Sequence, residues 1–213
     1  MSTPSLATGP ESRRIRMLPE QVINRIAAGE VIERPAAACR ELVENALDAG
    51  ATRIAVAIEG GGVERIEVTD DGCGMAPAEL ALAVQRHATS KLDDDQLIRI
   101  STLGFRGEAL PSIGAAARLA ITSRPAGQDA AFAISVEGGT VGEPRPTSGA
   151  PGTRVVVREL FFATPARRKF PKSPRTEADA TEAALRRLAL AAPGVAFRFE
   201  RDGVAALDRK SVV

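Results

Sequence analysis

Two strand-like segments joined by a glycine-rich turn restrict the folds open to this 213-residue chain. In "TRIAVAIEG" the apolar residues Ile54, Val56 and Ile58 occupy every second position, and in "ERIEVTD" Ile66 and Val68 do the same. A period of two is typical of a strand with one buried face. Because "EGGGV" connects the two segments, we expect a β-hairpin.

Further strand and helix patterns alternate along the chain. Helices are expected over "AAACRELVENALDA", which lies between Pro35 and Gly50, and over "APAELALAVQRH" and "EADATEAALRRLALAA", with shorter ones in "LPEQVINRI" and "DQLIRI". Strands are expected in "RLAITSR", "AAFAISVEG", "GTRVVVREL" and "VAFRFERDG". Strands in hairpin-like runs with helices inserted between them predict an α+β layered sandwich rather than a doubly wound parallel sheet.

Composition narrows the class of protein. Hydrophobic residues make up 44% and charged residues 26%, as in soluble globular proteins, and the net charge of +1 indicates neither a nucleic-acid nor a membrane partner. Two cysteines form no disulfide framework, which favours a reduced, cytoplasmic setting. No apolar run reaches transmembrane length, so no membrane association is expected. We expect residues 1–15 to form a mobile tail and residues 16–213 to form one domain.

The helix "RELVENALDAG" gathers polar oxygens on one side. At about 100° per residue, Glu41, Asn45 and Asp48 fall within an arc of roughly 60°, with Glu44 beside them. One interpretation is a solvated acidic face. The other is chemical: an amide oxygen such as that of Asn45 suits Mg²⁺ in a nucleotide site, and Glu41, one turn earlier, could take a proton from an attacking water. The helix alone leaves both open.

The segment "VTDDGCGM" ends a strand with Asp70 and Asp71, followed by Gly72 and Gly74. A carboxylate there can accept a hydrogen bond from the exocyclic amine of adenine. The glycines allow close approach of a flat ring. An ordinary Asp-Gly turn is the alternative.

Two later segments are suited to phosphate. In "HATSK" the side chains of Thr89 and Lys91 can contact phosphate oxygens. In "LGFRGEAL" the loop around Gly104 and Gly107 runs into a helix that begins at Glu108 or nearby, and its N–H groups can surround phosphates. A flexible loop without a ligand is the alternative, and no P-loop motif is present.

These motifs together are more specific than any one of them. "INRIAAGEVIERPAAACRELVENALDAGAT", "DDGCGM", "HATSK", "LGFRGEAL" and "FFATPARRKF" follow in an order and spacing that resemble the MutL mismatch-repair family, from about Met17 to the last residues. That family belongs to the GHKL superfamily, with DNA gyrase B, heat-shock chaperones and sensor histidine kinases. The resemblance implies a two-layer Bergerat sandwich over residues 16–213, a mixed, mostly antiparallel sheet with helices on one face.

The resemblance also implies roles for individual residues. Glu41 would be the general base, Asn45 the Mg²⁺ ligand, and Asp70 the partner of the adenine amine, with Gly74 and Thr153 near the base. The phosphate side would be formed by Thr89 and Lys91 and by a lid of Gly104, Phe105, Arg106, Gly107, Glu108, Ala109 and Leu110.

The implied function is an Mg²⁺-dependent ATPase that acts as a nucleotide-controlled dimerisation switch in mismatch repair. Its cofactors would be ATP and Mg²⁺, and its partners a second copy, contacted through an arm at residues 16–26, together with DNA and a MutS-type protein in the bacterial cytoplasm. The second, transducer-type domain of the family is absent or only begun at the C-terminus, so hydrolysis by this chain alone would be weak. Asp71 stands where the family most often carries Asn, and repulsion between Asp70 and Asp71 would raise one pKa.

Two other functions remain to be compared. A phosphotransferase of the sensor-kinase type needs a phosphoaccepting histidine before the domain, whereas the single His87 lies between the nucleotide motifs. A non-enzymatic DNA-binding module finds support in the basic run "ARRKFPKSPR", for which a solvated loop is the alternative. The basic residues of that run are Arg167, Arg168, Lys169, Lys172 and Arg175.

Overall fold

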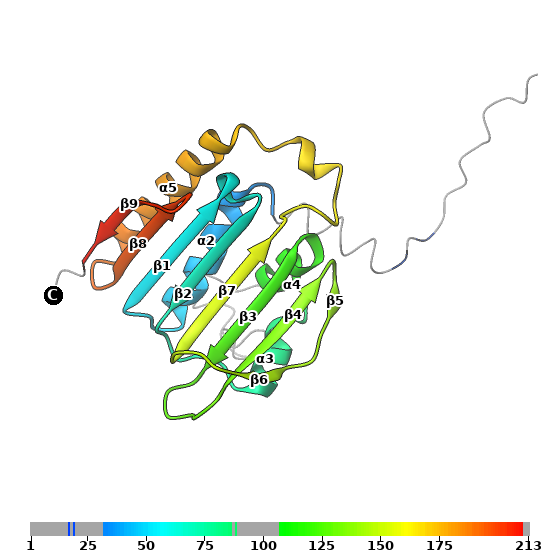
Figure 1. Cartoon of the computed structure of the whole chain (residues 1–213), viewed down its shortest axis with the longest axis vertical. Coiled ribbons are helices and arrows are strands. Elements are labelled where there is room, and N and C mark those ends of the chain that lie inside the picture. Colours follow the sequence, from blue (N-terminus) through cyan, green and yellow to red (C-terminus); the bar gives the residue numbers. More distant parts are fainter. Residues whose placement is uncertain (1–16, 18, 20–31, 87, 89–106, 211–213) are drawn as a thin grey trace, which may run out of the picture.

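A single mixed sheet organises the chain in the computed structural model, which describes residues 17, 19, 32–86, 88 and 107–210. Figure 1 shows the strands side by side with the helices on one face of the sheet. This confirms the expected α+β architecture. The predicted tail, the helices predicted in "LPEQVINRI" and "DQLIRI", and the predicted arm, apart from Met17 and Pro19, lie outside the described residues.

The strands run in the order β5-β4-β3-β7-β2-β1-β8-β9, and β6 pairs with β4. All pairs are antiparallel except β1 with β8, which is parallel. The hairpin predicted from the period of two is confirmed as β1–β2, with Val56 opposite Val68. The strands are β1 (Arg53–Glu59), β2 (Arg65–Asp70), β3 (Arg118–Arg124), β4 (Ala131–Glu137), β5 (Thr140–Val141), β6 (Arg145–Thr147), β7 (Gly152–Arg158), β8 (Ala196–Arg201) and β9 (Val204–Arg209).

The helices begin and end close to the residues that the sequence indicated. The helix expected between Pro35 and Gly50 ends just before Gly50, whose φ of 73° places it in the left-handed region that favours glycine. The described helices are α2 (Pro35–Asp48), α3 (Pro77–Ala83), α4 (Ala109–Ala116) and α5 (Pro174–Ala191), with 3₁₀ turns η1 (Gly60–Gly62) and η2 (Arg167–Lys169).

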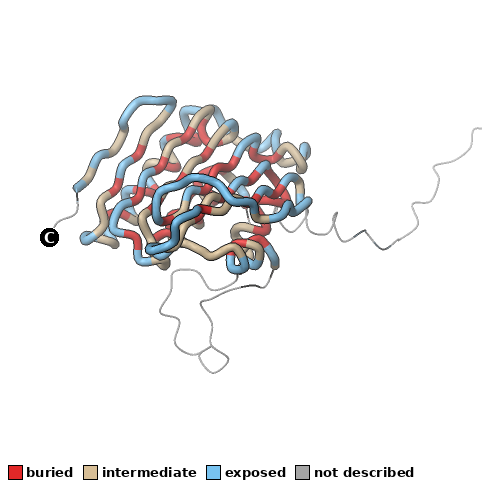
Figure 2. Tube along the Cα trace, turned by 60° about the horizontal axis from the view of Figure 1, so that its bottom comes forward, coloured by how far each residue is buried: buried red, intermediate tan, exposed pale blue. Residues whose placement is uncertain are grey.

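The core lies between the helices and the sheet. Residues at every second position of β1 and β2 face it, and Ile54, Val56, Ile58, Ile66 and Val68 are each at most 2% exposed. Figure 2 shows buried and exposed positions alternating along the chain trace. The alternation follows from the pleat, which sends successive side chains to opposite faces.

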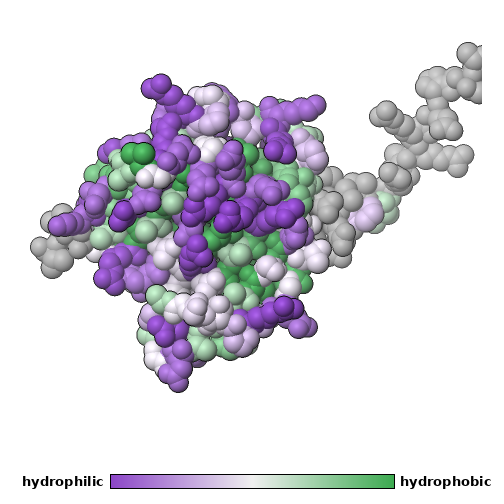
Figure 3. All heavy atoms as spheres, in the orientation of Figure 1, coloured by the Kyte–Doolittle hydropathy of each residue, from purple (hydrophilic) through white to green (hydrophobic). Residues whose placement is uncertain are grey.

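The other face of the sheet is polar. In Figure 3, hydrophilic side chains gather over the middle of the sheet. Glu67 of β2 pairs with Arg154 of β7, with 2.8 Å between Oε1 and Nε, and Arg65 contacts both Glu67 and Glu59. A hollow of about 840 Å³ lies on this side, bordered in part by residues 147–151. An antiparallel sheet with one apolar and one charged face accounts for the single layer of helices.

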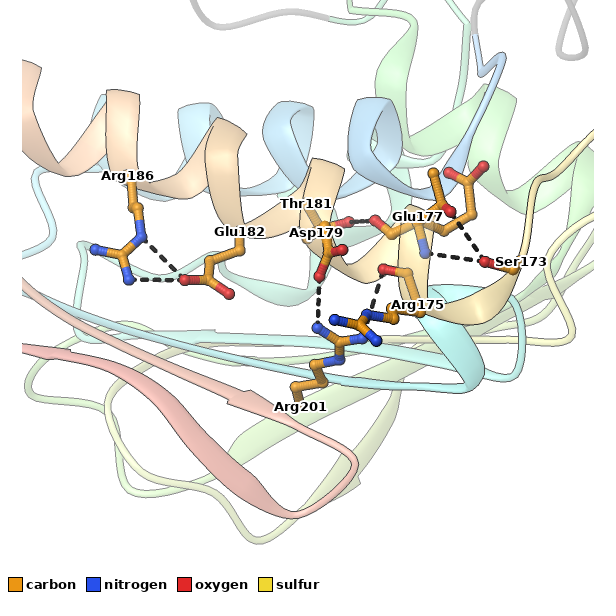
Figure 4. A network of polar contacts seen from close by, with 9 residues as sticks. Ser173, Arg175, Glu177, Asp179, Thr181, Glu182, Arg186 and Arg201 are labelled. Carbon is orange, nitrogen blue, oxygen red and sulfur yellow. Dashed lines mark hydrogen bonds and ion pairs between the residues drawn. The ribbon is translucent and has the colours of Figure 1, made fainter.

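A buried carboxylate joins the starts of the two longest helices. Glu177 of α5 is 2% exposed, and its Oε2 accepts hydrogen bonds from Nε and Nη2 of Arg34, at 3.1 and 2.9 Å. Its Oε1 accepts from the N–H of Lys172 at 2.9 Å. Figure 4 shows this part of α5, where Ser173 caps the helix and Arg201 reaches Asp179 from β8. Arg34 immediately precedes α2, so the pair fixes both helix starts against each other.

Replacing Arg34 by Ala should lower the free energy of unfolding by about 2–3 kcal/mol, because the buried Glu177 carboxylate loses its charged partner. The replacement Arg186→Ala is the control, since Arg186 pairs with Glu182 on the exposed side of α5 and should contribute less than about 0.5 kcal/mol. Urea unfolding followed by circular dichroism measures both. Equal losses would contradict the role given to the buried pair.

Candidate functional site

Three polar side chains stand in one row across the helix-covered face of the sheet. Asp70 lies opposite Thr153 in the β2–β7 pair, and Thr153 lies opposite Ser123 in the β7–β3 pair. The same row continues to Ile54 in β1 and to Phe132 in β4. The predicted residues Asp70 and Thr153, which are 83 positions apart, are therefore neighbours in the sheet.

Ser123 connects three segments of this site. Its Oγ accepts a hydrogen bond from the N–H of Met75 at 2.8 Å and donates to the carbonyl of Gly152 at 3.1 Å. It also lies 2.9 Å from Oγ1 of Thr153. The sequence analysis did not select Ser123, although a signal was present: in "RLAITSR" it occupies the next inward position after Leu119 and Ile121. A polar residue at an inward strand position needs hydrogen-bond partners inside the protein.

Two glycines permit the close packing around this row. Gly152, with φ of 106°, opens β7 where an added Cβ would overlap the backbone of Asp70. Gly74, with φ of 71°, follows β2 where an added Cβ would overlap the backbone carbonyl of Arg124. A side chain at either position would push the turn after β2 away from β3 and β7.

Asp70 is buried, at 9% exposure, and its Oδ1 accepts the N–H of Gly72 at 2.9 Å. Burial raises the pKa of Asp70, because it disfavours the charged form more than the N–H groups of Gly72 and Thr153 favour it. The neighbouring charge of Asp71 raises it further. The prediction that one pKa of the pair is raised is confirmed in direction, with burial rather than repulsion as the main cause.

Asp71 has a different environment. Its Oδ1 accepts from the N–H groups of Thr52 and Arg53, both at 2.7 Å, and its Oδ2 accepts from Thr52 Oγ1 at 2.7 Å and Arg53 Nε at 3.0 Å. Partial burial alone would raise the pKa of Asp71, but these hydrogen bonds and the Arg53 charge outweigh it and hold the pKa below its usual value. Asp71 therefore joins the turn after β2 to the start of β1.

The polar side of α2 is half-buried rather than fully solvated. Glu41, Glu44, Asn45 and Asp48 all have intermediate exposure. Arg40 donates to Oε1 of Glu41 at 3.1 Å, and its Nε lies 3.7 Å from Oε1 of Glu44.

The C-terminal end of α2 contacts the turn that follows Asp70. The N–H of Cys73 donates to the carbonyl of Ala49 at 3.0 Å, and the helix itself packs on β2. The structure thus brings the polar helix and the Asp70 turn together, as the motif order predicted.

The predicted lid is described from Gly107 onward. Glu108 precedes α4, as expected, and forms an ion pair with Arg86 at 3.7 Å; Ala109 and Leu110 form the first turn of the helix. Five predicted residues lie outside the described residues, namely Thr89, Lys91, Gly104, Phe105 and Arg106.

Two classes of site were searched for among the described residues. They include no group of three or more His, Cys, Asp or Glu side chains placed to hold a metal ion. Within the same part of the chain, no helix combines the length and apolar character needed to cross a membrane.

Comparisons with known proteins agree with this geometry. Residues 33–139 match the family described as histidine kinase-, DNA gyrase B-, and HSP90-like ATPase. The chain is 66% identical to the DNA mismatch repair protein MutL of Acidiphilium cryptum over 91% of its own length and 33% of that protein. It is 64% identical to MutL of Bradyrhizobium diazoefficiens, over 86% of the chain and 30% of that protein. The chain thus spans about a third of the length of these relatives.

Solved structures show the same fold. The Aquifex aeolicus MutL ATPase domain complexed with ADP is 32% identical, with a TM-score of 0.69, over 86% of this chain and 66% of that one. The N-terminal domain of a DNA repair protein is 27% identical with a TM-score of 0.72, over 89% of this chain and 57% of that one.

The matched family model, the mixed sheet and the helix-covered polar row define the class: the chain belongs to the histidine kinase-, DNA gyrase B- and HSP90-like (GHKL) ATPases. Its similarity to the mismatch-repair proteins extends over about nine-tenths of its length. Within the class it belongs with the N-terminal ATPase domains of MutL, which confirms the resemblance of its motifs.

The two adjacent aspartates should affect stability in opposite directions. Asp70 has a raised pKa, so the stability it contributes is present below its unfolded-state pKa and is lost as pH rises through its folded-state pKa. Asp71 has a lowered pKa, so its contribution is present above its unfolded-state pKa and is lost as pH falls through its folded-state pKa.

We therefore expect Asp70→Asn to raise the melting temperature at pH 7 and Asp71→Asn to lower it, each by roughly 2–4 °C for about 1 kcal/mol. Scanning calorimetry at pH 7 and pH 4 measures both variants, and each serves as the control for the other. The gain from Asp70→Asn should shrink at pH 4, where the wild-type carboxyl is increasingly protonated. A loss of stability in Asp70→Asn at pH 7 would contradict the effect assigned to burial.

Proposed function

We propose that this chain binds ATP with Mg²⁺, hydrolyses it, and uses the nucleotide state to control the pairing of two copies in DNA mismatch repair. The observation that carries the proposal is the position of Glu41 and Asn45, one turn apart on the half-buried side of a helix whose end contacts the Asp70 turn. The similarity to MutL proteins and to the ADP complex of the Aquifex aeolicus MutL ATPase domain supports it.

The sheet would hold the base of the nucleotide. Asp70, when ionised, offers a carboxylate that accepts a hydrogen bond from the exocyclic amine of adenine. Thr153 stands opposite Asp70 in the sheet, and Gly74 keeps the following turn close to β3. Because burial raises the pKa of Asp70, binding that depends on the ionised form should weaken as pH falls through that pKa.

The helix would hold the reacting end. Asn45 supplies one amide oxygen for Mg²⁺, which fits a site that depends on phosphates and waters, since the described residues include no cluster of three acidic or metal-binding side chains. Bound Mg²⁺ would neutralise charge on the phosphates. Glu41 would orient the attacking water and accept its proton. Thr89, Lys91 and the segment from Gly104 to Leu110 would surround the phosphates.

The switch would depend on ordering by ATP. In such proteins nucleotide binding orders a segment and hydrolysis releases it. Residues 16–26 would then contact the second copy. DNA and a mismatch-recognition protein would act on the paired form in the full-length protein.

Replacing Glu41 by Ala should reduce ATP hydrolysis by the full-length protein at least 100-fold, because the water loses its general base, while ATP affinity stays within about 3-fold. The unhydrolysed nucleotide should also hold the paired state, so the variant should accumulate as a dimer in ATP. Phosphate release, equilibrium binding and light scattering measure the three effects.

The matched control is Glu44→Ala, because both Glu41 and Glu44 contact Arg40 from the same helix. Hydrolysis by the control should stay near the wild-type rate. Unchanged turnover in Glu41→Ala, or equal losses in the two variants, would reject Glu41 as the base.

A second function, DNA contact, is favoured by one observation. Arg168, Lys169, Lys172 and Arg175 are all exposed on η2 and the segment that leads into α5. Such a group can neutralise DNA phosphates and release counterions.

We expect the double replacement Arg168→Ala and Lys169→Ala to weaken DNA binding and to lower the salt slope by about 1–2. Filter binding of one duplex between 50 and 200 mM salt measures both quantities. The double replacement Arg186→Ala and Arg187→Ala on α5 removes the same charge elsewhere and serves as the control. DNA affinity that is independent of salt in the wild type would exclude a phosphate-binding surface.

A further inference from the structure

The hydrogen bonds of Ser123 determine the direction of the hydroxyl group of Thr153. A serine hydroxyl has one proton to donate and two lone pairs to accept. The carbonyl of Gly152 only accepts, so the Ser123 proton is directed there, at 3.1 Å. The N–H of Met75 only donates, so it occupies one lone pair of Ser123, at 2.8 Å.

One interaction of Ser123 is left, the 2.9 Å contact with Oγ1 of Thr153. Since the Ser123 proton is already used, Thr153 is the donor in this contact and Ser123 the acceptor. This arrangement satisfies every partner of a side chain that is only 1% exposed. The Thr153 hydroxyl therefore has no proton left for a ligand, and its lone pairs remain as acceptors.

Asp70 lies beside this acceptor in the same row. Its ionised carboxylate has only acceptor sites, and Oδ1 already receives the N–H of Gly72. The β2–β7 pair thus presents two neighbouring side-chain acceptors. A ligand edge with a donor matches this arrangement, whereas an edge with a carbonyl oxygen at that position leaves two acceptors facing a third.

We propose that Ser123 is a positioning residue for base selection: by taking the proton of Thr153 it keeps the row Asp70–Thr153 entirely accepting, and so favours adenine over guanine. Adenine carries an amine where guanine carries a carbonyl oxygen. The inference rests on the proposed nucleotide function and adds to it the origin of the base preference. Ser123 acts through Thr153 and does not itself contact the nucleotide.

The test measures affinities of the protein for non-hydrolysable ATP and GTP analogues by calorimetry, in wild type and in Ser123→Ala, Thr153→Val and the double variant. In Ser123→Ala the Thr153 hydroxyl regains a free proton and can donate to a carbonyl. The preference for the ATP analogue should therefore fall roughly 10-fold. In the Thr153→Val background the same Ser123→Ala change should alter the preference less than about 2-fold.

Two further variants separate positioning from simple stability. The replacement Ser135→Ala makes the same change on β4 at an exposed position and should leave the preference unchanged. The replacement Thr153→Ser keeps the hydroxyl and should retain the preference. A purely structural role of Ser123 would weaken both analogues and would do so equally with Thr153 or Val at position 153.

The outcomes distinguish the inference from the function on which it rests. Wild-type binding of the ATP analogue with the preference unchanged in Ser123→Ala overturns the inference and leaves the proposed function standing. A wild type that binds both analogues equally also overturns the inference. A wild type that binds neither contradicts both.

Discussion

The register that joins β2, β7 and β3 is the constraint on which the candidate site depends. It places Asp70, Thr153 and Ser123 in one row on the helix-covered face. A shift of one residue in β7 would turn Thr153 to the charged face, since side chains alternate along a strand. Apolar pairs farther along the strands, such as Val68 with Val155, oppose such a shift because they lose their burial in it. Gly152 is required as well, because a side chain there would separate the strands.

The polar row shows how one sheet accommodates both a core and a binding surface. Ser123 is satisfied within the protein, but Asp70 is a buried carboxylate whose charged form is disfavoured. Asp71, the next residue, has the opposite effect because four hydrogen-bonding groups surround it. Two identical side chains thus differ through their neighbours: one stabilises the turn, and the other retains an unfavourable charge that suits ligand binding.

The elements that could be predicted are those set by local pattern. Pro35 and Gly50 bracket α2, and the period of two located β1 and β2, because these signals act through the residue's own backbone or through alternating burial. Ser123 was missed because its role depends on Met75 and Gly152, which only the sheet brings together. The strands β5, β6 and β9 were not predicted because they are short or largely exposed, so no strong alternation marks them.

The roles that we propose fall on two different elements, and the anchoring of α2 explains how they are kept in register. At its start, Arg34 holds the buried Glu177 of α5; at its end, the carbonyl of Ala49 receives the N–H of Cys73 from the Asp70 turn. A helix fixed at both ends positions Glu41 and Asn45 relative to the sheet without a direct bond to Asp70. Base recognition then belongs to the sheet and hydrolysis to the helix. Because no side chain serves both, either can change by substitution while the other is retained.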